Sequence, residues 1–203
     1  MSKFETDGPD KGKKKGEEDI PKWEFGQSLR GKLILADPRL TEPMFHQSVL
    51  LLTEHSEEYG ALGYILNRPI GKTVGELLPN PEFSDLENIP VFMGGPVSTE
   101  HLTFSAIAWS EYGDSLQFVT HLSASEALMH QMEGFSVRAF VGYSGWSEGQ
   151  LEDELKQDAW ITRNAEKRIV ELTGSESLWK EMLRDMGPWH RIIADEPEDL
   201  GLN

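Results

Sequence analysis

The chain has 203 residues, 38% of them hydrophobic, which is enough for one domain with a single sizeable core. It contains no cysteine, and this excludes disulfides, thiolate nucleophiles and cysteine-ligated metal sites. A formal net charge of -16 makes direct binding to nucleic acid an unfavourable hypothesis, because phosphate backbones select basic surfaces.

The N-terminal segment 1–25 is charged and almost free of apolar residues, so we expect a disordered tail. Its three consecutive lysines are followed at once by three acids, which favours a solvated tail over a nucleic-acid arm. The segment lacks the apolar run of a signal peptide, and no stretch approaches the roughly 18 apolar residues of a membrane span. We therefore expect a cytoplasmic protein without membrane contact. One domain is expected over 26–192, followed by a flexible acidic end over 193–203.

Short apolar, β-prone runs predict the strands of this domain. The runs at 33–36, 48–53 and 62–66 come first, and the last two flank a polar connection that is typical of a hairpin. Two further runs, at 102–109 and 116–122, are separated by SEYGDS and predict a second hairpin.

Helices are predicted by capping signals and apolar spacing. Ser123 and Glu126 have the spacing of a capping box, and Gly134 ends the predicted helix. Its inner face is expected to carry Ala124, Leu128 and Met132. A strand over 137–143 follows, and a last helix is expected near 175–186 before Gly187 and Pro188. Hairpins with three to four interspersed helices predict an α+β fold with a mostly antiparallel sheet.

The stretch FVGYSGWSEGQLEDELKQDAW, from Phe140 to Trp160, is mainly explained as a tight turn that begins a helix. Ser147 and Gln150 have capping-box spacing, the nearby acids favour the positive end of a helix dipole, and the glycines permit a sharp turn. Neither the cap nor the dipole explains Tyr143, Ser144 and Glu154. These three residues keep a functional reading open.

Three familiar catalytic and metal motifs are incomplete. A P-loop ending at Gly71-Lys72-Thr73 would need glycine at position 66, which is Leu66. The sequence GYSGW would be a nucleophile elbow around Ser144 only with glycine in place of Trp146. The six histidines have no metal-ligand spacing. We therefore predict no catalytic residue, no metal and no cofactor, and favour a protein that is not an enzyme.

Five blocks in register, GKLILADPRL, FHQSVLLLTEH, GALGYILNRPIG, VFMGGPVS and FVGYSGWSEGQLEDEL, resemble the YqgE/AlgH family over nearly all of residues 30–190. The resemblance implies an α+β domain whose sheet is partly closed into a small barrel with helices around it. It also implies a transcriptional-regulator label for some members.

The family blocks supply the candidate ligand or interaction residues, which are Asn67, Arg68, Gly94, Gly95, Tyr143, Ser144, Trp146 and Glu154. Turn geometry alone could explain the proline and glycine blocks. Arg68, in a chain this acidic, either pairs with an internal carboxylate such as Glu152 or Glu154, which is the favoured reading, or awaits an anionic ligand. His55 is interpreted as a turn or core histidine, not as a general base.

Two functions therefore stay open. The first is a non-enzymatic regulatory or interaction protein that affects transcription through a protein partner. The second is a binding module, or cryptic enzyme, for a small anionic metabolite, with Arg68, the glycine amides, Tyr143 and Ser144 converging on one pocket. The sequence does not predict an oligomeric state.

Overall fold

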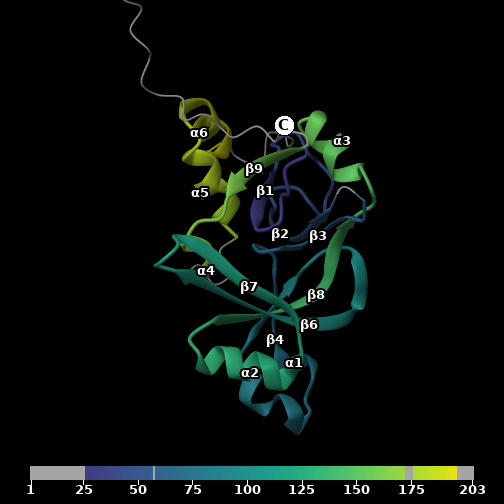
Figure 1. Cartoon of the computed structure of the whole chain (residues 1–203), viewed down its shortest axis with the longest axis vertical. Helices are drawn as coiled ribbons and strands as arrows, with labels where there is room; N and C mark the ends of the chain where they lie inside the picture. Colours follow the sequence, from purple (N-terminus) through teal and green to yellow (C-terminus); the bar gives the residue numbers. More distant parts are fainter. Residues whose placement is uncertain (1–25, 57, 172–175, 196–203) are drawn as a thin grey trace, which may run out of the picture.

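The computed structural model of the protein describes residues 26–56, 58–171 and 176–195 (Figure 1). The predicted tail over 1–25 lies outside the described residues, as do residues 196–203 of the predicted acidic end. In chain order the elements are β1 (Lys32–Ala36), β2 (Val49–Ser56), β3 (Gly60–Ile65), β4 (Pro69–Thr73), α1 (Val74–Leu77), the 3-10 helix η1 (Pro81–Leu86), β5 (Pro90–Met93), β6 (Val97–Ser110), β7 (Ser115–Leu122), α2 (Ala124–Met132), β8 (Ser136–Trp146), α3 (Gln150–Lys156), β9 (Trp160–Asn164), α4 (Arg168–Glu171), α5 (Leu178–Arg184) and α6 (Pro188–Ala194).

The nine strands form one mixed sheet, which confirms the α+β class. The strand order is β4-β5-β8-β3-β2-β1-β9, with β6 pairing to β8 and β7 pairing to β6. β8 is the central strand, because it pairs in parallel with β5 and antiparallel with β6 and β3. Figure 1 shows β1, β2, β3 and β9 in the upper half of the molecule and β6 to β8 below them.

The expected partial barrel is wrong, because the sheet is open. Among the described residues, β4 and β9 end the strand path, and β7 pairs only with β6. The main core cluster lies between the sheet and the C-terminal helices: it joins Leu33 and Phe140 of the sheet to Ile169, Trp179 and other apolar side chains of these helices. The helices therefore cover apolar sheet residues that the inside of a barrel would otherwise enclose.

The two predicted hairpins are confirmed, since β2 pairs antiparallel with β3 and β6 with β7. The predicted cap of α2 is also confirmed: Ser123 Oγ accepts from the Glu126 amide, and the Glu126 carboxylate accepts from the Ser123 amide at 2.8 Å. The predicted inner face of α2 is only partly right. Its buried residue is Ala127, whereas Met132 is 82% exposed.

The tight turn predicted over Gly142–Gly149 is shorter than expected, because β8 continues to Trp146. Helix α3 begins after Gly149, which has a φ of +73°. Half of the predicted capping box is present: the Ser147 amide donates to Gln150 Oε1 at 3.1 Å. The Ser147 hydroxyl also donates to Gln150 Oε1 and does not cap the helix.

Six elements had no prediction, namely β4, α1, η1, β9, α4 and α6. β4 contains proline and glycine, which usually interrupt strands, and α6 begins at Pro188, where a helix end was expected. The predicted last helix appears as α5, and position 175 lies outside the described residues.

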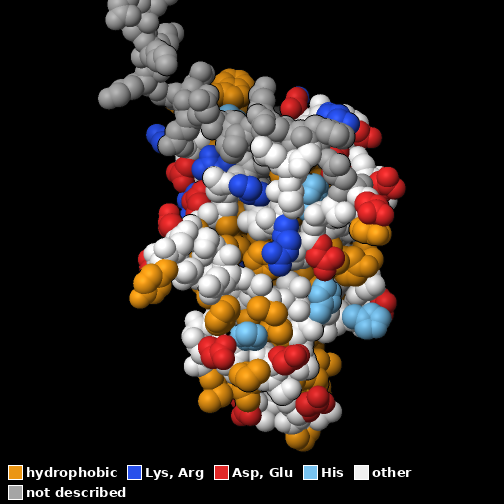
Figure 2. Space-filling view, in the orientation of Figure 1, with side chains coloured by type: hydrophobic (Ala, Val, Ile, Leu, Met, Phe, Trp, Pro, Cys, Tyr) orange, Lys and Arg blue, Asp and Glu red, His pale blue; other side chains and the backbone are white. Residues whose placement is uncertain are grey.

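Charge is unevenly distributed on the face shown in Figure 2. Lysine and arginine side chains gather in the upper half, and the lower end around α1 and α2 carries hydrophobic and acidic side chains. No helix in the described ranges has the length and apolar character that a membrane crossing requires.

Candidate functional site

A cleft with a volume of about 770 Å³ lies beside the turn that joins β3 to β4. We call it the Arg68 cleft. It is lined by Pro43, Met44, His46, Gln47, Asn67, Arg68, Pro69, Ile70, Met93, Glu176, Ser177 and Lys180. The lining thus combines apolar side chains with neutral polar, cationic and acidic ones.

Asn67 holds the loop before β2 in place. Its Oδ1 accepts from the Val49 amide and its Nδ2 donates to the Gln47 carbonyl, both at 2.9 Å. Gln47 has a φ of +54°, a left-handed conformation that non-glycine residues adopt at a cost of about 1–3 kcal/mol. Asn67 is buried, and both its oxygen and its nitrogen bind the backbone, so it is a structural residue of the cleft wall.

Arg68 does not pair with Glu152 or Glu154, so the favoured reading from sequence is wrong. Its Nη2 donates to the His46 carbonyl at 2.5 Å, and its Nε is buried without a partner. A guanidinium has five N–H donors. Within the part of the chain that the structure describes, Arg68 has this one hydrogen bond and no carboxylate partner.

The two carboxylates expected for Arg68 are engaged elsewhere. Glu152 Oε1 lies 2.9 Å from Nε2 of His55. Glu154 Oε2 accepts from the indole N–H groups of Trp146 and Trp160, at 2.9 and 2.7 Å. Both carboxylates therefore have other partners and do not pair with Arg68.

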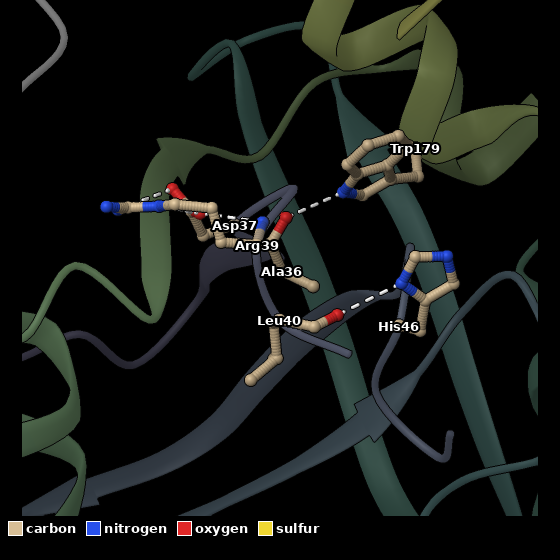
Figure 3. A network of polar contacts seen from close by, with 6 residues as sticks. All are labelled: Ala36, Asp37, Arg39, Leu40, His46 and Trp179. Carbon is tan, nitrogen blue, oxygen red and sulfur yellow. Dashed lines mark hydrogen bonds and ion pairs between the residues drawn. The ribbon is translucent and has the colours of Figure 1, made fainter. Parts of the chain in front are cut away.

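The imidazole of His46 is a second nitrogen-containing side chain in the lining of the Arg68 cleft. Its Nδ1 lies 3.0 Å from the Leu40 carbonyl, as Figure 3 shows. A carbonyl oxygen can only accept, so Nδ1 carries a hydrogen. Nε2 lies on the far side of the ring from Leu40 and has no partner among the described residues (Figure 3).

The segment that presents the Leu40 carbonyl is itself anchored. Asp37 accepts from the Arg39 amide and pairs with the Arg39 side chain at 2.7 Å, and the Leu40 amide donates to the Asp37 carbonyl (Figure 3). The Asp37 pairing raises the pKa of Arg39 above its usual value, chiefly through the hydrogen bond. Trp179 donates to the Ala36 carbonyl at 2.8 Å and fixes the end of β1 to α5.

The glycine block at 94–95 packs directly on β8 and does not open into the Arg68 cleft. A Cβ on Gly95 would lie 2.3 Å from the Tyr143 carbonyl carbon and 2.4 Å from the Ser144 amide nitrogen. Ser144 is 0% exposed, and its hydroxyl donates to the Gly94 carbonyl at 3.1 Å. Ser144, predicted as a ligand or interaction residue, thus joins two backbone segments.

Tyr143 and Trp146 line a different hollow, of about 650 Å³, together with His55. The predicted candidate residues therefore do not converge: Asn67 and Arg68 lie in one cleft, Tyr143 and Trp146 in another, and Ser144 is buried. Glu154 holds the two indoles, whose rings meet edge to face with centroids 6.1 Å apart. No single pocket contains the set.

Sequence reasoning missed the buried couple between His55 and Glu152. Both side chains are buried, and the Leu29 amide donates to His55 Nδ1 at 3.1 Å. Nε2 therefore carries the hydrogen that Glu152 accepts. The two residues are 97 positions apart, so no local spacing could have identified them. The reading of His55 as a core histidine agrees with this burial.

The described residues contain no group of three or more histidine and acidic side chains arranged to hold a metal ion. The expectations of no cofactor and no catalytic residue stay predictions.

Comparison with known proteins places the chain in a family. Residues 33–191 match the family described as AlgH-like. A UPF0301 protein of Chlorobium limicola is 33% identical over 195 residues, covering 89% of this chain and 98% of that protein. A UPF0301 protein of Streptomyces coelicolor is 37% identical over 190 residues, covering 87% and 96%.

Solved structures agree with these matches. The solution structure of the AlgH protein from Pseudomonas aeruginosa has a TM-score of 0.61 and 26% identity, covering 87% of this chain and 98% of that one. A crystal structure of a Corynebacterium diphtheriae protein, 20% identical, has the same fold with a TM-score of 0.65 over 86% and 95%. The chain therefore belongs to the AlgH-like family, as the five sequence blocks predicted.

Proposed function

We propose that the protein is a non-enzymatic binding module that takes a small anion in the Arg68 cleft. The observation that carries the proposal is the state of Arg68. Its guanidinium lines the cleft, donates to one neutral carbonyl and has no carboxylate partner among the described residues. A partly buried charge is usually paired, because leaving it unpaired forfeits its solvation. An anionic ligand would supply the missing partner.

The composition of the chain strengthens this reading. The sequence has 35 acidic residues against 19 lysines and arginines, so carboxylates are the most available partners for any arginine. Lys180 adds a second cation to the cleft wall, and Glu176 is the one acid among the described residues that line it. The cationic residues of the cleft thus favour the binding of an anion, although the net charge of the chain disfavours it.

The proposal is non-enzymatic because the polar groups of the candidate site have structural partners. Ser144 is buried and donates to a carbonyl, and Glu154 holds two indoles. His55 uses one ring nitrogen on a backbone amide and the other on Glu152. Within the described ranges, these groups form no nucleophile and base couple.

Native mass spectrometry and anion titration test the proposal. We expect freshly purified protein to carry a ligand of defined mass, and R68M to lose it, while R191M should retain it because Arg191 is exposed on α6 and does not line the Arg68 cleft. Equal anion binding by the wild type and R68M would overturn the proposal.

A second candidate function, action through a protein partner, is favoured by strand β7. Among the described residues β7 pairs on one edge only, and its sequence SLQFVTHL has neither an acid, a lysine, an arginine nor a proline. Such residues usually protect edge strands from pairing. We propose that an extended segment of a partner protein adds to this edge, with no direct contact to DNA.

Substitution within β7 tests this second candidate. A partner captured by the wild type should slow hydrogen exchange of the β7 amides, and V119P should weaken its capture. If the β7 amides exchange hydrogen at the same rate with and without the captured protein, strand addition is excluded.

A further inference from the structure

We infer that His46 is a second, protonatable ligand of the Arg68 cleft, and that the ligand carries a dianionic oxyanion group of the phosphate monoester type. This inference rests on the proposed anion-binding function and specifies its ligand class.

The geometry begins with the fixed tautomer of His46. Its Nδ1–H is used by the Leu40 carbonyl, so Nε2 is the nitrogen that can gain a proton or contact a ligand (Figure 3). The ring cannot turn over without losing that 3.0 Å contact. His46 therefore presents a single titratable nitrogen from a fixed position in the wall of the cleft.

His46 and Arg68 are tied together at the backbone. The Arg68 guanidinium donates to the carbonyl of His46 itself, so the two side chains belong to one small region of the cleft wall. The other charged groups that line the cleft are Lys180 and Glu176. A protonated His46 and Arg68 would be like charges in this region of the cleft wall.

A bound dianion reverses this relation. Two negative charges can be matched by Arg68 and a protonated His46, so ligand binding and proton uptake favour each other. A monoanion would need only Arg68 and would take up little or no proton. A dianionic group is thus the ligand charge that Arg68 and a protonated His46 together would match, and tetrahedral oxyanions are the common biological examples.

The apolar part of the lining indicates what the oxyanion is attached to. Met44, Ile70 and Met93 line the same cleft as the charged side chains. This mixed lining fits a phosphoryl group on an uncharged, partly apolar body better than a free inorganic ion.

Sulfate is the first probe, because it stays dianionic over the range in which histidine changes charge, about pH 5 to 8. Any pH dependence of its binding then comes from the protein. We expect calorimetry to show about tenfold tighter sulfate binding at the acid end, the size of one charge-assisted hydrogen bond. Repeating it in two buffers with different ionisation enthalpies should show proton uptake.

The decisive variant is H46N, whose amide can keep the donor to Leu40 but lacks the titratable nitrogen. It should bind sulfate with the same affinity at both pH values. H130N, at a histidine that contacts Glu133 outside the cleft, should behave as the wild type does. Comparing the affinities for phenyl phosphate and inorganic phosphate at one pH tests the contribution of the apolar lining residues. We expect the ester to bind more tightly.

The outcomes separate the two proposals. Sulfate and phenyl phosphate that fail to bind the wild type at either pH would overturn the anion-binding function itself. If R68M abolishes binding but H46N binds with the same pH dependence as the wild type, only the role of His46 is overturned. Equal affinity for phenyl phosphate and inorganic phosphate would overturn the assignment of an apolar body.

Discussion

Replacing Gly95 with alanine should strongly destabilise the fold. The new Cβ would lie 2.3 Å from the Tyr143 carbonyl carbon, 2.4 Å from the Ser144 amide nitrogen and 2.4 Å from the Ser144 hydroxyl. Two of these atoms are backbone atoms of the central strand β8 and cannot rotate away. Overpacking costs about 1–3 kcal/mol and an unfavourable backbone conformation, here a φ of +156°, adds about as much.

We therefore expect the free energy of unfolding of G95A to fall by about 3–5 kcal/mol, measured by urea denaturation with tryptophan fluorescence. G134A is the matched control. Gly134 also has a positive φ, +91°, but its Cβ would meet nothing within 4 Å. This variant should lose only about 1–2 kcal/mol. Equal losses in the two variants would refute the argument that close packing fixes glycine at position 95.

Three further predictions concern single side chains. E154A should lower the free energy of unfolding by about 2–4 kcal/mol, because two indole donors lose their acceptor. E148A, at an exposed acid, should change it little. Equal effects of the two substitutions would contradict this role of Glu154. Burial raises the pKa of Tyr64 above 10.0, so its contribution to stability is present below that pH and is lost as pH rises through the folded-state pKa. Y64F should show a smaller alkaline loss of stability in urea titrations, and an unchanged loss would count against this. Hydrogen bonds from the Ser123 hydroxyl and then the Ser123 amide hold the pKa of Glu126 below 4.5, so its contribution is present above that pH and is lost as pH falls through the folded-state pKa. E126Q should therefore flatten the acid side of the stability curve, and a curve parallel to the wild type would exclude a role for this cap.

Local signals predicted the local elements well. The two hairpins and the cap of α2 depend on residues a few positions apart, and these were confirmed. The barrel failed because closure depends on which distant element covers the core. The C-terminal helices, joined to the sheet through Ile169 and Trp179, provide that cover, and no short pattern encodes it.

For the candidate site, too, local sequence signals were informative and long-range contacts were not. The family blocks supplied Asn67 and Arg68 as candidates, the acidic composition singled out Arg68, and both residues line the Arg68 cleft. It paired Arg68 with the wrong partners because Glu152 and Glu154 are held by groups that sequence spacing does not reveal. His46 was missed since its significance depends on a hydrogen bond to Leu40 and on the neighbouring guanidinium.

The pairing of β1 with β9 has a consequence for how the chain is made. Lys32 and Asn164 face each other across this ladder although 132 positions separate them. Contacts of such long range close slowly, because a large loop must be ordered before they form. During synthesis the ribosome therefore has to release most of the polypeptide before β1 gains its second neighbour. Until then one edge of that nascent strand stays open to chaperones or to mispairing.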